Sequence, residues 1–151
     1  MVTLYTDGAS RGNPGPGGYA AILQYKGHKR ELVGAFLHTT NNRMELLAII
    51  VGLEALKKEQ DVLVYSDSRY AVDAIMKGWL KKWVLTDFKK KKNRDLWSRF
   101  WQVFQRHRVS CTWVRGHAEN VMNERCDFLA SRAAKKGPWL IDEGYVNHYS
   151  T

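Results

Sequence analysis

The sequence predicts an α/β fold, in which helices pack on one mixed sheet. Three strand-like segments come first, and helical and strand-like segments then alternate, which is the order of an α/β domain. The length of 151 residues suits one domain, and 44% of the residues are hydrophobic, enough for an ordinary core. The sequence contains no internal repeat, low-complexity tract or linker that would divide it.

Five strands are predicted from apolar alternation and from the turns that end them. They cover residues 2–7, 19–25, 30–37, 61–67 and 108–114. The first stops at the glycine- and proline-rich turn "DGASRGNPGPGG", and the second and third flank the turn "KGHK", which predicts a hairpin. The fourth is short and apolar, so we expect it to be buried.

Four helices are predicted from apolar residues spaced three and four apart. They cover residues 42–58, a segment that starts after Ser68, residues 93–105 and residues 124–136. Ser68 has the side chain of a helix N-cap residue. The segment 137–151 has no clear periodicity, and we expect it either to dock through Trp139 and Tyr145 or to be mobile.

Glu45 lies on or beside the face of the first helix that should meet the core. That face is formed by Met44, Leu47, Ala48, Val51 and Ala55. A buried carboxylate without a partner costs several kcal/mol or takes up a proton. Glu45 therefore reaches solvent, pairs with Arg43 or Arg69, or binds a cation.

Two other acids end two strands of similar sequence, "VTLYTD" and "LVYSD". In open α/β sheets, ligands gather at the carboxyl ends of strands, so parallel, adjacent strands would bring Asp7 and Asp67 side by side, within reach of Glu45. A fourth acid, Asp127, borders a stripe of small residues on the last helix. Each acid alone is most simply a turn, cap or surface residue.

Carboxylates that meet need a counter-charge, because each raises the pKa of the others. Oxygen ligands suit Mg²⁺ or Mn²⁺, whereas zinc favours histidine or cysteine. Two such ions about 4 Å apart catalyse in-line displacement at phosphates. Convergence of the acids would thus indicate a metal site for phosphate chemistry.

The charge balance points to a polyanionic partner. Lysine and arginine number 24 against 15 acidic residues, a net charge of +9. Nucleic acid is the first candidate and an anionic membrane surface the second, although the charge can also serve solubility.

We find no apolar run of about 20 residues that would span a bilayer and no signal peptide. Cys111 and Cys126 form no disulfide framework, so we expect a cytoplasmic protein with both thiols buried. The sequence has no unusual apolar repeat that would indicate an interface with a second copy of the chain, so we expect a monomer.

Five blocks together make the sequence resemble type 1 ribonuclease H of the bacterial kind. They are "YTDGASRGNPGPGG", "TTNNRMEL", "YSDSRY", "KNRDLW" and "RGHAENVMNERCDFLA". The resemblance implies a ribonuclease H-like fold, with a mixed five-stranded sheet and helices on both faces. It also implies a catalytic domain over residues 1–136, followed by the tail 137–151.

The resemblance implies an activity and its catalytic residues. The family hydrolyses the RNA strand of RNA–DNA hybrids and leaves 5′-phosphate and 3′-hydroxyl ends. The four metal-binding carboxylates would be Asp7, Glu45, Asp67 and Asp127. Asp7 would bridge two Mg²⁺ ions, for which Mn²⁺ can substitute, with Asp127 on the side of the attacking water and Glu45 and Asp67 on the side of the leaving 3′ oxygen. His117 and Glu124 match residues linked to proton transfer or product release.

The resemblance also implies substrate contacts. Residues that match readers of the minor groove and the 2′-hydroxyls are Ser10, Asn13, Asn41 and Asn42. Thr40 and Asn93 match a pocket for a DNA-strand phosphate, and Trp79 and Trp83 lie in a basic protrusion over residues 78–94. Arg69 stands where a glutamine often contacts the hybrid. His38 replaces a common arginine and the protrusion is short, so we expect weaker substrate binding.

Two other function classes remain open. One is a hybrid- or RNA-binding module without catalysis, in which the acids are structural. The other is a DNA nuclease or strand-transfer domain, which also uses clustered acids. The turn "GNPGPGG" lacks the spacing of a nucleotide-binding loop. We expect His28, His107 and His148 to have no functional role, and the aromatic residues Trp97, Trp101 and Phe104 to belong to the core.

Overall fold

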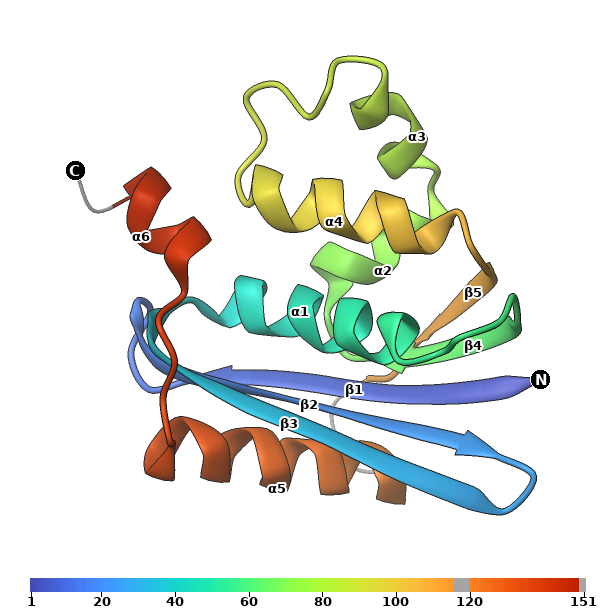
Figure 1. Ribbon diagram of the computed structural model, residues 1–151, viewed down its shortest axis with the longest axis horizontal. Coiled ribbons are helices and arrows are strands. Elements are labelled where there is room, and N and C mark those ends of the chain that lie inside the picture. The colour runs from blue at the N-terminus through green and yellow to red at the C-terminus, as the bar shows by residue number, and fades with distance from the viewer. Residues whose placement is uncertain (116–119, 150–151) are drawn as a thin grey trace.

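One mixed five-stranded sheet forms the centre of the molecule, as predicted. The computed structural model describes residues 1–115 and 120–149. Its strands are β1 (Val2–Ser10), β2 (Gly15–Tyr25), β3 (His28–Thr39), β4 (Asp61–Ser66) and β5 (Arg108–Trp113). The spatial order is β3-β2-β1-β4-β5 (Figure 1). β1, β2 and β3 pair antiparallel, whereas β4 runs parallel to β1 and to β5. The parallel, adjacent arrangement expected for the strands that end at Asp7 and Asp67 is therefore confirmed.

Helices cover both faces of the sheet. They are α1 (Asn41–Glu54), α2 (Arg69–Met76), α3 (Trp79–Val84), α4 (Arg94–Phe104), α5 (Val121–Lys136) and α6 (Glu143–Tyr149). α1 lies on one face with α4 above it, and α5 lies alone on the other face (Figure 1). The large core cluster lies on the α1 side, and a smaller cluster around Ile22, Cys126 and Ala130 lies under α5.

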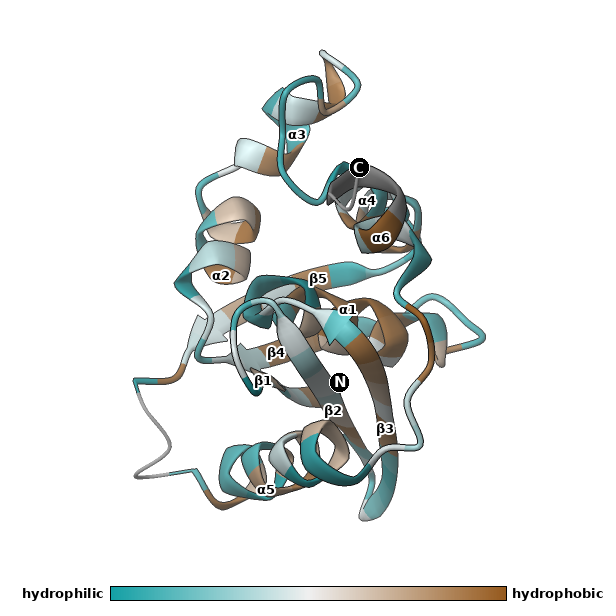
Figure 2. Ribbon diagram, turned by 90° about the vertical axis from the view of Figure 1, so that its left-hand side faces the viewer, coloured by the Kyte–Doolittle hydropathy of each residue, from teal (hydrophilic) through white to brown (hydrophobic). Residues whose placement is uncertain are grey.

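α1 is more deeply buried than its sequence predicts. We expected one buried face, but every residue from Arg43 to Ile50 is buried. The reason is that α1 is packed between the sheet and α4, so apolar residues on both of its sides are covered (Figure 2). The helix also ends at Glu54 rather than at residue 58, because Lys57 and Lys58 are exposed and have no apolar surface to cover.

The other helix predictions hold with small shifts of the ends. Ser68 caps α2, and its hydroxyl accepts a hydrogen bond from the Ala71 amide at 3.2 Å. Trp97 is fully buried in the core, with Trp101 and Phe104 packed against it, as expected. Cys111 and Cys126 are also buried, and burial raises the pKa of the Cys111 thiol to about 12. None of the described helices is both long and apolar enough to cross a membrane.

The tail docks on the rest of the molecule. The main chain of Leu140 exchanges hydrogen bonds of 2.9 Å with Leu37 and Ala35 of β3. Trp139 is 40% exposed and donates its indole N–H to the Ala134 carbonyl, while the Tyr145 ring lies 5.4 Å from that of His38. Of the two expected alternatives, a docked or a mobile tail, the structure shows the docked one, and the main chain at Leu140 contributes to it besides Trp139 and Tyr145.

A buried arginine joins the tail to α1 and α4. Arg43 is 1% exposed, and its guanidinium donates to Asp142 of the tail, Asp95 of α4 and the side-chain oxygen of Asn93. Asp142 also accepts from the Thr39 hydroxyl at 2.6 Å. Burial lowers the pKa of Arg43, but its hydrogen bonds to Asp95 and Asp142 outweigh burial and raise that pKa. Arg43 is thus committed to these two aspartates and holds the first turn of α1 in place.

Candidate active site

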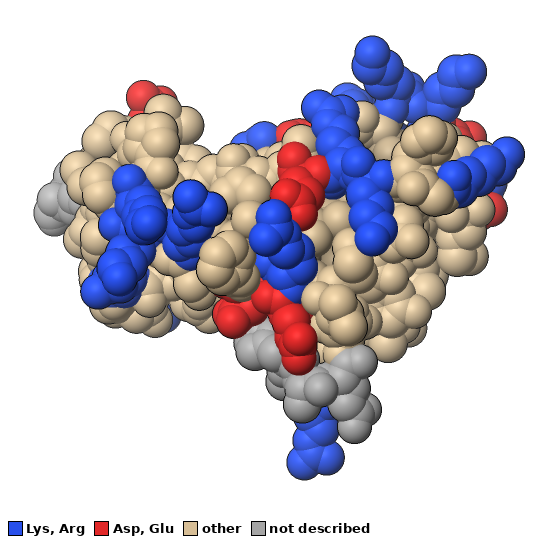
Figure 3. All heavy atoms as spheres, turned by 90° about the horizontal axis from the view of Figure 1, so that it is seen from below, with Lys and Arg blue, Asp and Glu red and all other residues tan. Residues whose placement is uncertain are grey.

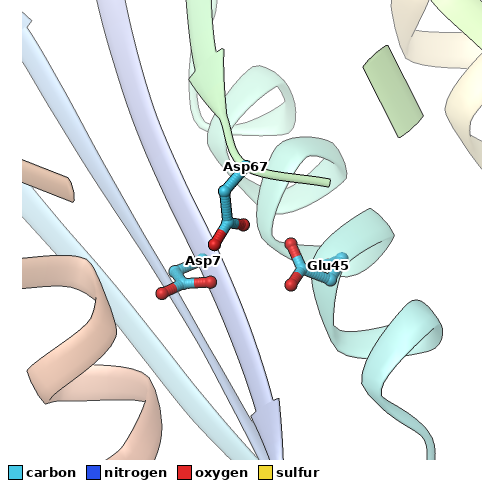
Figure 4. A group of neighbouring side chains, drawn as sticks. All are labelled: Asp7, Glu45 and Asp67. Atoms are coloured by element: carbon cyan, nitrogen blue, oxygen red, sulfur yellow. The ribbon is translucent and has the colours of Figure 1, made fainter. Parts of the chain in front are cut away.

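Three carboxylates from separate parts of the chain meet at one point. Asp7 comes from β1, Glu45 is the fifth residue of α1, and Asp67 is the residue after β4. One oxygen of each lies within 4.8 Å of the others, and Figure 4 shows the three side chains pointing toward one another. Asp7 and Glu45 are only 4% and 6% exposed. The convergence predicted from the sequence is therefore present.

Local sequence sets this geometry. β1 and β4 run in register, with Tyr5 opposite Tyr65, so both aspartates follow at the same edge of the sheet. Gly8 lets α1 approach β1, because a Cβ there would lie 2.4 Å from the Glu45 nitrogen. That distance is shorter than any tolerated contact, so only glycine brings Glu45 this close to Asp7.

The cluster is electrostatically unfavourable when it is ionised without a cation. Burial, followed by the negative charges of Asp67 and Asp127, raises the pKa of Asp7 to about 8, although the Gly8 amide donates to its Oδ1 and acts in the opposite direction. Burial, followed by the charges of Asp67 and Asp7, raises the pKa of Glu45 well above its usual value. A positive charge at this point would therefore stabilise all of these groups.

Asp127 approaches Asp7 from the opposite face of the sheet. It lies on α5, and both its charge and its hydrogen bond to Asp7 raise the pKa of Asp7. It is not one of the three carboxylates that lie within 4.8 Å of one another. The fourth predicted acid thus borders the cluster on one side, while Glu45 lies on the other.

Asn123 positions α5 and was missed by the sequence prediction. It is 2% exposed, and its side-chain amide donates to the carbonyls of Thr6 and Tyr65, each at 3.3 Å. It therefore joins the ends of β1 and β4, one residue before Asp7 and two before Asp67. The available signal was its spacing, because Asn123 precedes Cys126 and Ala130 at three- and four-residue steps on the buried face.

The donor set fits a hard divalent cation. All candidate ligands are carboxylate oxygens, as Mg²⁺ and Mn²⁺ prefer. Glu45 Oε2 is buried without a hydrogen-bond partner among the described residues, and its carboxylate does not pair with Arg43, which Asp95 and Asp142 occupy. An unsatisfied, buried carboxylate oxygen that faces two further acids is what a metal ligand offers before the ion binds.

A cavity of about 320 Å³ lies beside the start of α1 and is lined by four of the nine predicted substrate residues. Its lining consists of Asn13, Pro14, Thr40, Asn42, Lys92, Asn93 and Tyr145. Asn41 borders this group, because its amide donates to Asn13 Oδ1 at 3.1 Å. Lys92 and Tyr145 were not predicted, and Tyr145 reaches the cavity only because the tail docks. Ser10 is half-buried at the end of β1 and does not line this cavity.

Asn93 is more constrained than a surface contact residue. It is 8% exposed; its side-chain oxygen accepts from Arg43, and its amide group donates to the Tyr70 hydroxyl, both at 3.3 Å. Its backbone has a φ of 60°, in the left-handed region, where asparagine is tolerated. The fold therefore fixes Asn93 at the wall of the cavity.

The predicted aromatic contacts of the protrusion differ in role. Trp79 is 37% exposed, with the Lys77 ammonium 5.3 Å from its ring centroid. Trp83 is half-buried and packs edge-on against Trp97 at 5.0 Å. Trp83 therefore belongs largely to the core, and Trp79 offers the more accessible ring.

The remaining predicted residues lie in different settings. The Arg69 guanidinium stacks on Trp113 at 4.2 Å, and Glu124 is exposed on the first turn of α5. His117 and the His148 side chain lie outside the described residues. His107 accepts a hydrogen bond from the Gln60 amide and is buried, in keeping with a structural role.

Comparison with known proteins decides the family. A family model described as RNase H matches residues 1–135. The chain belongs to the ribonuclease H family. It is 54% identical over 146 residues to a ribonuclease H of Desulforamulus reducens, covering 93% of this chain and 92% of that protein.

Solved structures of the family share the fold. LC9-RNase H1, described as a type 1 RNase H with the type 2 active-site motif, superposes with a TM-score of 0.81 at 32% identity, covering 99% of this chain and 82% of that one. LC11-RNase H1, solved in complex with RNA/DNA hybrid, has a TM-score of 0.68 at 23% identity, covers 90% of this chain and 98% of that one, and supports the fold alone. The predicted type 1 ribonuclease H family is thus confirmed.

Proposed function

We propose that this ribonuclease H hydrolyses the RNA strand of RNA–DNA hybrids by two-metal-ion catalysis and leaves 5′-phosphate and 3′-hydroxyl ends. The observation that carries the proposal is the cluster of Asp7, Glu45 and Asp67, with Glu45 Oε2 buried and unsatisfied. LC11-RNase H1, which shares the fold, was solved with RNA/DNA hybrid bound and lends support to this substrate.

The arrangement of the acids supports two cation positions. The pKa of Asp7 responds to both Asp67 and Asp127, whereas that of Glu45 responds to Asp67 and Asp7. Asp7 would therefore be the shared ligand, with Glu45 and Asp67 on one side and Asp127 on the other. Bound there, Mg²⁺ or Mn²⁺ would activate the attacking water and stabilise the charge on the leaving 3′ oxygen.

The protein's own residues orient the substrate around this centre. Asn41, Asn42, Asn13 and Ser10 offer the amide and hydroxyl groups that can read 2′-hydroxyls. The cavity lined by Thr40 and Asn93 can hold a phosphate of the DNA strand, with Lys92 supplying a positive charge. The imidazole of His117 and the exposed carboxylate of Glu124 can accept or deliver protons as the product leaves.

We further propose that residues 1–136 form the catalytic domain, that the docked tail completes the cavity through Tyr145, and that the enzyme is a cytoplasmic monomer. Thiols that remain free and buried at Cys111 and Cys126 suit a reducing compartment.

The decisive experiment compares RNA–DNA hybrid, duplex RNA and duplex DNA as substrates, each with Mg²⁺ and with EDTA. We expect cleavage of the RNA strand of the hybrid only, and only with Mg²⁺. Binding of hybrid without cleavage would favour a non-catalytic module, and equal cleavage of duplex DNA would favour a DNA nuclease.

The Asp7→Asn variant tests the metal mechanism. It should lose at least about 10³-fold of the cleavage rate, because removing a shared ligand disrupts both cation positions, while hybrid binding persists. The Glu59→Gln variant removes an exposed carboxylate that pairs with Arg108 before the start of β4; as a control for the loss of one carboxylate, it should cleave at the wild-type rate. Cleavage by Asp7→Asn at the wild-type rate would refute the mechanism.

A further inference from the structure

A second concave surface lies beside the acid cluster, on the outer side of α5. This groove has a volume of about 530 Å³, and its lining consists of Arg11, Asp127, Phe128, Ser131, Arg132, Lys135 and Lys136. Four of these seven residues are cationic, and three of the four lie on the C-terminal half of α5. Figure 3 shows basic side chains gathered over that end of the helix.

The four cations of the groove have no carboxylate partner among the residues that the structure describes. Nearby cations do have partners: Arg125, on the same helix, binds Glu31 at 2.9 Å. Lysines in the last turn of a helix also offset its dipole, which accounts for Lys135 and Lys136. The dipole does not account for Arg11, which comes from the β1–β2 turn, or for Arg132, which lies a turn earlier. A shared anionic ligand accounts for all four.

The groove opens onto the proposed catalytic centre. Asp127 lines the groove and is hydrogen-bonded to Asp7. Arg11 follows Asp7 by four residues, about 13 Å of extended chain, and Lys135 follows Asp127 by eight helical residues, about 12 Å. A nucleic-acid strand carries one phosphate per about 3.4 Å of helix axis. A strand with one phosphate at Asp7 therefore places others, within about four nucleotides, beside these cations.

We propose that this groove binds the phosphodiester backbone of the RNA strand, within about four nucleotides of the cleavage site. The inference rests on the proposed function, because it takes the RNA phosphodiester at Asp7 as its reference point. The arginines offer planar donor groups to phosphate oxygens, and the lysines add point charges. The RNA strand, rather than the DNA strand, is assigned to the groove because the RNA phosphodiester is the one that meets Asp7 and Asp127.

The first test measures binding without cleavage. In the Asp7→Asn background, the triple variant Arg132→Ala/Lys135→Ala/Lys136→Ala should bind hybrid about tenfold more weakly by fluorescence anisotropy. The slope of log Kd against log salt should fall by about 2, because fewer counterions are released. The control Lys29→Ala/Arg30→Ala/Lys57→Ala removes the same charge from exposed sites at the start of β3 and after α1, and should bind as the parent does. Unchanged far-ultraviolet circular dichroism and melting temperature exclude a folding defect in either variant.

The second test identifies the strand. A chimeric strand with a short central ribonucleotide stretch, paired with a DNA strand, fixes the cut position. In one substrate, neutral methylphosphonate linkages replace phosphates of the chimeric strand within about four nucleotides of the cut position. In the other substrate, they replace the phosphates of the DNA strand that lie opposite the cut position. Neutral linkages in the cleaved strand should weaken binding by the parent but not by the groove variant. Neutral linkages in the DNA strand should weaken both proteins equally.

Three results would overturn the inference. The first is a groove variant that binds hybrid like the control, and the second is equal weakening of both proteins by neutral linkages in the cleaved strand. The third is a difference between the two proteins that appears only with neutral linkages in the DNA strand. Because these tests measure binding, they separate failure of the groove from failure of the proposed function. The latter would appear as absence of hybrid cleavage by the wild-type protein with Mg²⁺.

Discussion

At the scale of single residues, the site holds negative charge where the fold alone does not favour it. Asp7 and Glu45 are buried beside further acids, and their raised pKa values have the same origin, loss of water followed by like charges. Structural acids usually show the opposite behaviour, as Glu31 does, whose pKa the hydrogen bond from Arg125 lowers. The contrast separates Asp7 and Glu45, the acids of the proposed metal site, from acids such as Glu31 that form ion pairs on the fold.

This difference predicts how stability depends on pH. The pKa of Asp7 is about 8 in the folded protein against 3.8 ordinarily, so the fold favours the protonated acid. The resulting contribution to stability is full below about pH 4 and is lost as the pH rises toward 8. Without metal, Asp7→Asn should therefore be the more stable protein at pH 8, by about 3 kcal/mol, and the gap should shrink by pH 5.

Urea denaturation of wild type and Asp7→Asn at pH 5 and pH 8, in EDTA, measures this gap. Addition of Mg²⁺ should stabilise the wild type and leave the variant nearly unchanged. Equal stability of the two proteins at both pH values would contradict the electrostatic account of the cluster.

At the scale of elements, the tail is joined to α1 by a buried charge cluster rather than by apolar packing alone. Asp142 contacts Arg43 and Thr39, and Tyr145 follows it into the wall of the cavity. The same few contacts therefore affect both the stability of the protein and the shape of the cavity beside α1.

The variant Asp142→Asn should lower the free energy of unfolding by about 2–4 kcal/mol, because it leaves the Arg43 guanidinium partly uncompensated in the interior. It should also raise the KM for hybrid more than it lowers kcat, since the cavity loses its wall while the carboxylates stay. Asp87→Asn removes an exposed partner of Arg94 and should cost less than about 1 kcal/mol. An Asp142→Asn protein as stable as Asp87→Asn would contradict the proposed role.

The two tryptophans of the protrusion should separate binding from stability. Trp79→Ala should weaken hybrid binding with little loss of stability, because its ring is partly exposed. Trp83→Ala should lower the unfolding free energy by about 2–3 kcal/mol, because it removes packing against Trp97. Thermal melting and anisotropy on both variants check this division, and a reversal of the two effects would refute it.

Most strands and the main helices were predictable, because their apolar periodicity reflects burial on one side. The exceptions have physical causes. α1 is covered on two sides, so its pattern understates its burial. α3 and α6 are short helices held by tertiary contacts, and six or seven residues carry too little periodicity to detect.

The site was predictable to a different degree at each residue. The acids could be proposed because each follows a recognisable strand or lies on a helix face. Asn123 and Tyr145 could not, because their roles depend on contacts with residues distant in the sequence: Asn123 bonds Thr6 across 117 positions.

At the scale of the whole molecule, the net charge of +9 surrounds a site whose own residues are acidic. Binding of hybrid should therefore be strongly salt-dependent while metal binding is local. We expect log Kd to rise linearly with log salt, with a slope of several units, each unit corresponding to about one phosphate contact. Measurement of the Kd of the Asp7→Asn variant for hybrid at salt concentrations from about 50 to about 200 mM checks this slope. A slope near zero would contradict a backbone-dominated interface.

The absence of a side chain at Gly8 limits which substitutions the carboxylate cluster can accept during evolution. Glutamate in place of an aspartate of the cluster would still carry a negative charge, whereas position 8 has no equivalent replacement. Even one added methyl group would meet the backbone of α1 and move Glu45 away from its neighbours. Alanine at position 8 would therefore separate the carboxylates although it changes none of them.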